Sequence, residues 1–256
     1  MVTEDGEPIV AAFPLRGEWV AAHTPAERVP SHGTDLLGQR FAYDFLRIEH
    51  DAKGWKFFRG SAAEYALLGV GLNQCYGWSE PIYAPFDGSV ITAEDGWPER
   101  KRLHFLKDMA AILKNTLLFD PKKTTDLRAV LGNHIILKMN DEEVYAFFAH
   151  ARYGSLKAGE GEAVALGQHL ADVGHSGNST APHLHFHLMD KLDILQANGL
   201  PCQFRNYEAF HNGEWHKIAS GMPSKRELVR YTLSQDPVSN TRAQASGIGM
   251  PTSPRA

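Results

Sequence analysis

The chain has 256 residues, of which 43% are hydrophobic, a composition typical of a globular protein with one large domain or two small ones. The formal net charge is −4 and the basic residues are interspersed with acidic ones, which argues against a nucleic-acid partner. No apolar run approaches the ~18 residues of a membrane span, and the acidic N-terminus lacks the features of a signal peptide, so the sequence by itself points to the cytoplasm.

The N-terminal part of the chain predicts few regular elements. Residues 1–30 contain four prolines around a short apolar stretch, which indicates an irregular lead-in with room for one edge strand. Residues 40–48 are strand-like, with aromatic side chains on both sides of Asp44. An acid within an apolar strand is costly unless it is paired or bound to a metal. Residues 81–93 predict two short strands that form a hairpin around a central Asp-Gly turn.

Residues 98–120 change the pattern, because apolar residues recur there at intervals of three and four. This spacing predicts an amphipathic helix inserted between strands, with its apolar stripe packed against the sheet. The stripe consists of Leu103, Leu106, Met109, Ala110, Leu113 and Leu117.

β-Structure resumes after the insertion. Short apolar runs bounded by turn residues predict strands at 134–139, 143–150, 162–167 and 169–174. A further hairpin is predicted within 207–215, and the polar residues 221–256 are expected to form a flexible tail. We therefore predict a mainly β fold, an antiparallel sheet or sandwich, as one domain over 31–220 that follows the lead-in.

Residues 181–188, Ala-Pro-His-Leu-His-Phe-His-Leu, show the alternation of a half-buried strand. His183, His185 and His187 share one face, while the leucines and the phenylalanine between them anchor the other face in a core. Neutral imidazole is the commonest protein ligand for zinc. The row therefore predicts a metal site, and the alternative is a polar sheet face with a chance excess of histidine.

A hydrolytic zinc site needs three protein ligands, an open position for water, and a group that moves protons or stabilises an oxyanion. His185 is the central imidazole of the row, Asp44 offers a carboxylate, and His150 ends an apolar strand, where a side chain can enter a cleft. Taken alone, His150 could be a structural strand-end histidine, and Asp44 could pair with Arg40 or Arg47. The remaining histidines show no ligand pattern and are expected to be structural: His23, His50, His104, His134, His169, His175, His211 and His216. Of these, His175 could line a cleft.

Three motifs together resemble the lysostaphin/LytM family of zinc metallopeptidases. Tyr-Ala-Phe-Phe-Ala-His ends at His150, a Gly-x-x-Val-type hairpin covers 161–174, and Gly-Asn-Ser-Thr-Ala-Pro-His-Leu-His-Phe covers 177–186. The strands predicted on both sides of the helical insertion are similar to two further strands of that family. The resemblance covers about residues 30–190. It implies an antiparallel β metallopeptidase domain with an open groove over its sheet.

The resemblance also implies roles for individual residues. His185 corresponds to a zinc ligand of the family, and Asp44 corresponds to a second one. His183 corresponds to a histidine that faces the reacting carbonyl, and together with His150 it would orient water or stabilise the tetrahedral oxyanion. The residues expected to border the substrate groove are Asn178, Ser179 and His187, the last of which could also support a ligand.

The third ligand departs from the family pattern. The family places a histidine four residues before the ligand aspartate, where this chain has Arg40, and a guanidinium cannot ligate a metal. His32, twelve residues before Asp44, could return to the metal if the intervening segment loops out, and we prefer it as the third ligand. Gln39 or a second water is an alternative, whereas Asp35 paired with His32 lies in turn-like sequence and is less attractive.

The resulting hypothesis is a metalloendopeptidase that uses one zinc ion to hydrolyse peptide bonds in peptidoglycan cross-bridges or stem peptides. The expected partner is a peptide or peptidoglycan substrate, with no nucleic acid and no membrane-spanning segment. Arg40 keeps open the alternative of a catalytically inactive binding or regulatory module of the same family, whereas a biotinyl- or lipoyl-type carrier lacks its modifiable lysine at a hairpin tip. The resemblance implies the cell envelope, against the cytoplasmic expectation above, and the oligomeric state is left open.

Overall fold

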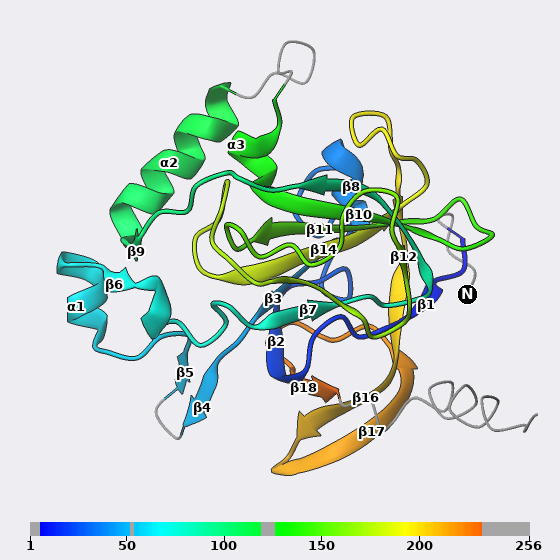
Figure 1. Cartoon of the computed structure of the whole chain (residues 1–256). Helices are drawn as coiled ribbons and strands as arrows, with labels where there is room; N and C mark the ends of the chain where they lie inside the picture. Colours follow the sequence, from blue (N-terminus) through cyan, green and yellow to red (C-terminus); the bar gives the residue numbers. More distant parts are fainter. Residues whose placement is uncertain (1–5, 52–53, 119–125, 232–256) are drawn as a thin grey trace, which may run out of the picture.

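The centre of the computed structural model, which describes residues 6–51, 54–118 and 126–231, is one large sheet (Figure 1). The strands are β1 (Ile9–Ala12), β2 (Gly17–His23), β3 (Tyr43–Leu46), β4 (Glu49–Asp51), β5 (Gly54–Lys56), β6 (Val70–Gly71), β7 (Pro81–Tyr83), β8 (Gly88–Glu94), β9 (Arg102–Leu103), β10 (Asn133–Met139), β11 (Tyr145–Ala151), β12 (Ala163–Val164), β13 (His169–Asp172), β14 (His183–Met189), β15 (Gly199–Leu200), β16 (Cys202–His211), β17 (Glu214–Gly221) and β18 (Leu228–Tyr231). The helices are η1 (Leu36–Phe41), α1 (Ala62–Leu67), η2 (Leu72–Gln74), α2 (Phe105–Leu118) and α3 (Arg128–Leu131).

Within the described residues, twelve strands form the main sheet in the order β1-β16-β18-β2-β3-β14-β11-β10-β8-β12, with β15 beside β14 and β17 beside β16. The central neighbours are antiparallel, and β1 runs parallel to β16 at one edge. Three short ladders, β13-β7, β4-β5 and β6-β9, complete the architecture. The predicted mainly β, antiparallel fold is thereby confirmed.

The strand β14 separates a core side from a cavity side. Leu184, Phe186 and Leu188 are each 0% exposed and belong to the main hydrophobic cluster. That cluster also contains Ile82 of β7 and Leu170 of β13, so this small ladder packs on the same side of the sheet. The three histidines of β14 alternate with the buried residues and line a cavity on the opposite face. The alternation predicted for this strand is confirmed.

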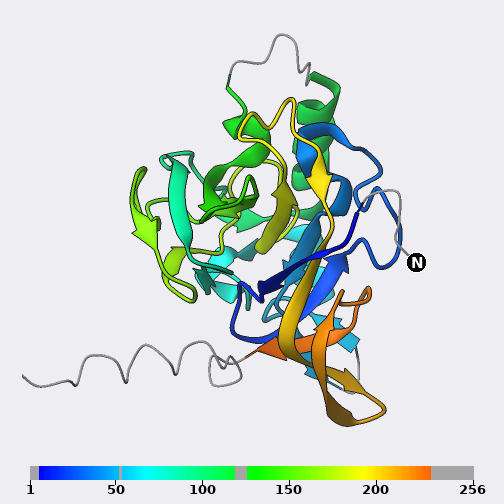
Figure 2. The same ribbon diagram turned by 90° about the vertical axis from the view of Figure 1, so that its right-hand side faces the viewer.

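The second strand, β2, and the last strand, β18, pair with each other near the middle of the sheet. Residues 17–23 form β2, which pairs with β3 and β18, so the lead-in expected to be irregular supplies a central strand. The fully buried Trp19 and Tyr231 anchor this pairing in the core. Residues 232–256 of the predicted tail lie outside the described residues. The hairpin predicted near 207–215 is longer than expected, and it extends from the lower end of the molecule in Figures 1 and 2.

The hairpin predicted for residues 81–93 does not form, although both strands exist. β7 pairs with β13, whereas β8 pairs with β10 and β12. Ala84 N donates to Gln168 O, and Asp87 Oδ1 accepts from Leu166 N, so the turn is bonded to the 165–168 segment. The Asp-Gly turn therefore carries the chain from the small ladder into the main sheet.

The predicted helical insertion forms α2, but its apolar stripe does not pack against the sheet. Leu106, Met109 and Leu113 are 66%, 44% and 59% exposed, and Ala110 is also exposed. Leu103 is buried, but it lies in β9 rather than in the helix, and the side chain of Leu117 lies outside the described part. The stripe faces outward because polar contacts, described below, hold the opposite side of the helix. In the described ranges no helix combines the length and the apolar character needed to cross a membrane.

Candidate metal centre

Asp44 is the residue on which the candidate site converges. It lies in β3 directly opposite His185 of β14, and its side chain is 13% exposed. Its Oδ1 atom lies 2.9 Å from Nδ1 of His185 and 3.5 Å from Nε2 of His183. Its Oδ2 atom lies 2.9 Å from Nε2 of His32 and 2.9 Å from Nδ1 of His23. One buried carboxylate therefore contacts four imidazoles.

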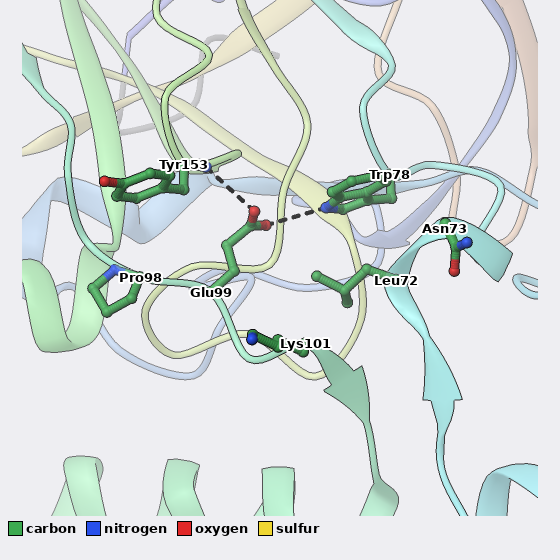
Figure 3. Close-up of a pocket in the computed structure, with 7 residues that line it drawn as sticks. All are labelled: Leu72, Asn73, Trp78, Pro98, Glu99, Lys101 and Tyr153. Carbon is green, nitrogen blue, oxygen red and sulfur yellow. Dashed lines mark hydrogen bonds between the residues drawn. The ribbon is translucent and has the colours of Figure 1, made fainter.

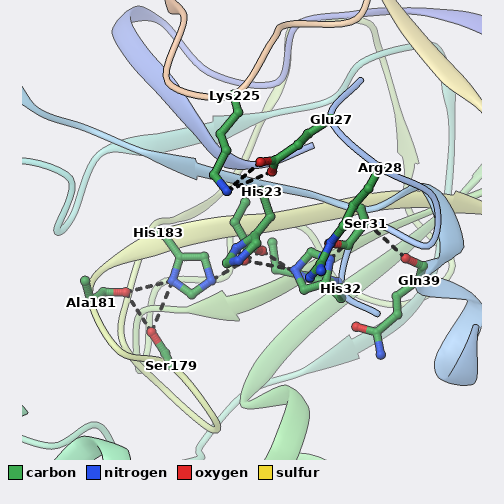
Figure 4. A network of polar contacts seen from close by, with 12 residues as sticks. His23, Glu27, Arg28, Ser31, His32, Gln39, Ser179, Ala181, His183 and Lys225 are labelled. Carbon is green, nitrogen blue, oxygen red and sulfur yellow. Dashed lines mark hydrogen bonds and ion pairs between the residues drawn. The ribbon is translucent and has the colours of Figure 1, made fainter. Parts of the chain in front are cut away.

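His32 reaches the carboxylate because the segment after it loops out and returns to β3. Ser31 N donates to Arg40 O at 3.0 Å, which closes the loop. Ser31 Oγ lies 3.0 Å from Nδ1 of His32, and this leaves Nε2 for the carboxylate (Figure 4). Arg40, which stands where the family has its histidine, forms an ion pair with Asp35 at 2.9 Å. The structure thus brings His32 rather than residue 40 or Asp35 to the site, and the role of His32 as a ligand remains a prediction.

His23 belongs to the same group, although its sequence context shows no ligand pattern. A shift in the β2–β3 register between Ala21 and His23 places His23 opposite Asp44. Donor atoms of His23, His32 and Asp44 all lie within 4.8 Å of one another. The side chain of His23 is 45% exposed, against 18% for His32, so it lies at the solvent edge of the group. Only the pairing of distant strands identifies this residue.

His150 and His183 form a second pair beside the carboxylate, with ring centroids 4.9 Å apart. Nδ1 of His150 lies 2.9 Å from the carbonyl oxygen of Ser176. Nδ1 of His183 lies 2.7 Å from the carbonyl oxygen of Ala181, as Figure 4 shows. A carbonyl oxygen only accepts hydrogen bonds, so we assign the proton of each ring to Nδ1. Both Nε2 atoms are then acceptors while the rings are neutral.

The backbone at His150 is unusual. Its φ of 63° lies in the left-handed region, which non-glycine residues adopt rarely and often at functional sites. The β10–β11 register shifts at the same place, because Asn133 lies opposite Ala151 whereas Ile135 lies opposite Phe148. As a result, the consecutive residues Ala149 and His150 both line the cavity instead of alternating between faces.

His187 lies behind the central ligand candidate. It is 1% exposed, and its Nδ1 lies 3.2 Å from Nε2 of His185. Its ring centroid lies 5.0 Å from that of Phe147, its partner across the β11–β14 ladder. No hydrogen-bond partner for its buried Nε2 is found among the described residues. His187 is therefore placed to orient the ring of His185, and its burial leaves little of it for contact with a substrate.

The pKa values of the group follow from burial around one negative charge. Burial opposes ionisation of Asp44, but His183 and His32 outweigh it and hold the pKa of the carboxyl well below its usual range. Burial also opposes ionisation of His183, yet Asp44 outweighs it and raises the pKa of that imidazole. Burial, reinforced by His183 and His185, holds the pKa of His150 well below its usual range. Burial lowers the pKa of His185, although Asp44 opposes this. An ionised carboxylate and a neutral imidazole are the forms that bind a divalent cation.

The side chains of the site open into a cavity of about 450 Å³. Asn178 lines it, with its backbone N–H bonded to Val130 O and its Oδ1 atom 3.4 Å from Nδ2 of Asn115 in α2. Ser179, expected at the groove, is instead 1% exposed, and its Oγ lies 3.2 Å from Nδ1 of His183. Ser179 therefore holds a histidine from behind.

Two neighbouring residues that the sequence does not single out, Glu99 and Arg100, fix the loop before β14. The Glu99 carboxylate accepts hydrogen bonds from Trp78 Nε1 and Tyr153 N (Figure 3), and from the backbone N of His175 at 2.6 Å. The guanidinium of Arg100 donates to Gly177 O and Ser179 O and forms an ion pair with Asp108 of α2 at 2.8 Å. These contacts join the helical insertion to the loop that carries the groove residues.

The donor set fits a zinc ion. Zn²⁺ binds imidazole nitrogen and carboxylate oxygen at about 2.0–2.2 Å, which places tetrahedral donors roughly 3.3 Å apart. Nε2 of His32 and Nδ1 of His185 each lie 2.9 Å from an oxygen of Asp44, so only a small widening is needed. Among the described residues, the group whose donor atoms all lie within 4.8 Å of one another consists of His23, His32 and Asp44. His185 is not part of that group and contacts it through Asp44.

A mainly β sheet that gathers histidines and one aspartate in a cavity is an arrangement suited to a metal-dependent hydrolase. Residues 121–197 match the profile of Peptidase family M23, which confirms the predicted lysostaphin/LytM-type relationship. This part of the chain is therefore similar to a peptidase family. The matched segment contains His150, His183 and His185, whereas Asp44 and His32 lie outside it.

Solved structures of related peptidases are similar to this chain at low identity. The catalytic domain of the antimicrobial peptidase lysostaphin from Staphylococcus simulans is 18% identical, with a TM-score of 0.34 over 72% of this chain and 88% of that one. A mutant catalytic domain of the prophage-encoded M23 protein EnpA from Enterococcus faecalis is also 18% identical, with a TM-score of 0.34 over 62% and 73%. A zinc containing peptidase from Vibrio cholerae is 17% identical, with a TM-score of 0.36 over 78% and 46%. A search of curated proteins found no match.

Proposed function

We propose that the chain is a zinc-dependent endopeptidase that hydrolyses peptide bonds in peptidoglycan. The observation that supports this most is the convergence of His32 and His185 on the two oxygens of Asp44, each at 2.9 Å, within a chain that is similar to a peptidase family over residues 121–197. In this proposal the three residues are the protein ligands of one zinc ion. Their two nitrogens and one oxygen leave a position for water or substrate.

Zinc held there would polarise the scissile carbonyl and lower the pKa of a bound water to about 7. His150 and His183 supply the remaining polar groups. Their Nδ1–H groups are held by backbone carbonyls at 2.9 and 2.7 Å, so each ring presents Nε2 in a fixed orientation. A neutral ring can take a proton from the attacking water, and a protonated ring can donate to the oxyanion or to the leaving amine.

Peptidoglycan as the substrate is supported by the resemblance of the motifs and not by a feature of the cavity. The cavity has an apolar part formed by Leu37, Ile112 and Phe147 beside the polar group, which suits an extended peptide. Small floor residues such as Ala149 leave room for a backbone close to the ligands. On this proposal the protein acts at the cell envelope.

Metal content tests the proposal before any activity assay. Plasma mass spectrometry is applied to the full chain as wild type and as the variants His185→Ala, His32→Ala and His23→Ala. The exposed His216 of β17 provides the matched control variant, His216→Ala. We expect about one zinc per chain in the wild type, His23→Ala and the control, and loss in the other two variants. If His32→Ala keeps its zinc and His23→Ala loses it, the third ligand is His23 and not His32.

Activity separates the enzyme from the binding module. The zinc-loaded protein is incubated with purified peptidoglycan and with oligoglycine peptides, and new amino termini are quantified. Release of new amino termini that requires zinc supports the peptidase. A wild type that takes up no zinc, or that takes up zinc and releases nothing, contradicts it and favours the binding module.

A further inference from the structure

The groove continues past the metal centre into a second cavity of about 480 Å³. Leu131, Phe147 and Ile194 line both cavities, so the two spaces meet over β11. The second cavity lies over β10 and β8, to the side of β11 away from β14. Its polar lining residues are Thr92, Glu94, Asp126, Arg128 and His134.

Strand register places this polar group on the same face as the candidate ligands. His134 of β10 lies opposite Glu94 of β8, and the neighbouring pair on β10 and β11 is Ile136 opposite Phe147. β10 lies two strands from β14 in the sheet order. At about 4.8 Å per strand, β10 and β14 are separated by roughly 10 Å, a distance that an extended peptide crosses in about three residues.

His134 is a buried acceptor directed into this cavity. It is 7% exposed, and its Nδ1 lies 2.9 Å from the carbonyl oxygen of Gly132, so Nδ1 carries the proton. Burial lowers the pKa of His134, which keeps the ring neutral. Among the described residues, no hydrogen bond to Nε2 of His134 is found, and the ring lines the cavity. A ligand that donates a hydrogen bond would satisfy this nitrogen.

Among the described residues that line this cavity, the charges leave an excess of one negative charge. The guanidinium of Arg128 is held by Asp126 through two hydrogen bonds, at 3.0 and 2.9 Å, so this pair is neutral as a unit. Glu94 is 46% exposed and lies 3.9 Å from Nη1 of Arg128, too far for a hydrogen bond. Its carboxylate is therefore available to a cation. The apolar side chains of Leu131 and Ile136 line the approach.

We propose that this second cavity is a subsite for a primary ammonium group of the substrate, carried on an aliphatic side chain about three residues from the bond that is cleaved. An ammonium group has three donors, which can serve Nε2 of His134 and the carboxylate of Glu94 together. An anionic group would meet Glu94 without gaining Arg128, which Asp126 already holds. The inference rests on the proposed function, because it takes the metal centre as the position of the reacting bond.

Binding of matched peptides to the full chain tests the subsite. Two fluorescein-labelled probes are used, acetyl-Lys-(Gly)₅ and (Gly)₅-Lys, each compared with the same peptide carrying Nε-acetyl-lysine. Fluorescence anisotropy is measured with and without added zinc, so that binding does not depend on cleavage. We expect at least one lysine peptide to bind roughly tenfold more tightly than its acetylated form, as for a charge-assisted hydrogen bond.

Variants assign the preference to these residues. Glu94→Gln, a change at a partly exposed position that keeps the shape, should remove most of the preference, and His134→Gln should reduce it. Glu214→Gln on the exposed end of β17 is the matched control and should keep it. Equal binding of lysine and acetyl-lysine peptides by the wild type, absence of saturable binding, or a preference that survives Glu94→Gln would overturn the subsite. A preference that persists in a protein without zinc uptake supports the subsite and overturns only the proposed zinc chemistry.

Discussion

The floor and the wall of the groove are held in different ways. The floor consists of β3, β14 and β11, where ladder register alone places His185 opposite Asp44 and Phe147 opposite His187. The wall includes α2, which has no ladder partner and is tied to the loop before β14 by side chains. A side chain of the floor can therefore be replaced without moving the backbone, because backbone hydrogen bonds hold the strands. Replacing one side chain that ties down α2 can instead detach the helix from the loop.

The largest expected effect tests the floor. His150→Asn removes one imidazole but tolerates the left-handed φ of 63° at this position. We expect peptide hydrolysis to fall by roughly 10²–10⁴-fold, the contribution typical of a general acid–base group. Zinc content and the unfolding midpoint should stay close to wild type, because the ring has one hydrogen bond, to Ser176 O, and is not a proposed ligand. Loss of zinc together with activity would show that replacing His150 disturbs the metal ligands, against the expectation that the floor keeps its backbone.

The second prediction tests the wall. Arg100→Leu leaves Asp108, whose side chain is 2% exposed, without its ion-pair partner. Breaking such a pair from one side costs about 3 kcal/mol of unfolding free energy, measured by urea denaturation. Zinc uptake should be unchanged, since none of the proposed ligands contacts Arg100.

A double variant distinguishes the ion pair from general damage. Arg100→Leu combined with Asp108→Leu removes the stranded charge as well, so part of the lost stability should return. Equal loss in the single and double variants would indicate that the hydrogen bonds from Arg100 to Gly177 O and Ser179 O matter more than the pair.

The sequence predicted the floor well because local pattern and strand geometry coincide there. Alternation in β14 correctly assigned Leu184 and Phe186 to the core, and the motif around His185 correctly indicated the family. The looped-out segment expected between His32 and Asp44 exists, and the two side chains lie 2.9 Å apart. Each of these three inferences required information from only a short stretch of chain.

The remainder depended on contacts between distant segments. His23 joins the site through a register shift between β2 and β3, which no local pattern encodes. The periodicity of α2 identified a helix but assigned the wrong face to the interior, since the face turned inward carries Asp108, which is buried in an ion pair with Arg100. The Asp-Gly turn at 87–88 predicts a hairpin that does not form, since β7 and β8 pair with strands that lie far along the chain.

A smaller effect concerns the junction of wall and floor. Burial, together with the Arg100 guanidinium, lowers the pKa of His175 to about 3. The unfolded chain binds a proton at His175 near pH 6.5 and the folded chain does not. The contribution of His175 to the unfolding free energy is therefore present above pH 6.5 and is lost as the pH falls toward 3. At pH 5.5 the loss is about 1.4 kcal/mol. His175→Gln should therefore flatten the decline in unfolding free energy between pH 7.5 and 5.5 by this amount, and an unchanged decline would contradict a buried neutral imidazole.

The smallest expected effect tests the orientation of α2. Leu106→Gln, Met109→Gln and Leu113→Gln change side chains that are 66%, 44% and 59% exposed, and glutamine has a helix propensity close to theirs. Each should alter the unfolding free energy by no more than about 0.5 kcal/mol. Leu170→Ala, at a position of β13 that is 0% exposed in the main hydrophobic cluster, should cost about 2–5 kcal/mol in the same urea titrations. If the α2 variants cost as much as Leu170→Ala, the stripe packs against the protein and burial holds the wall, because polar contacts alone would leave these positions insensitive.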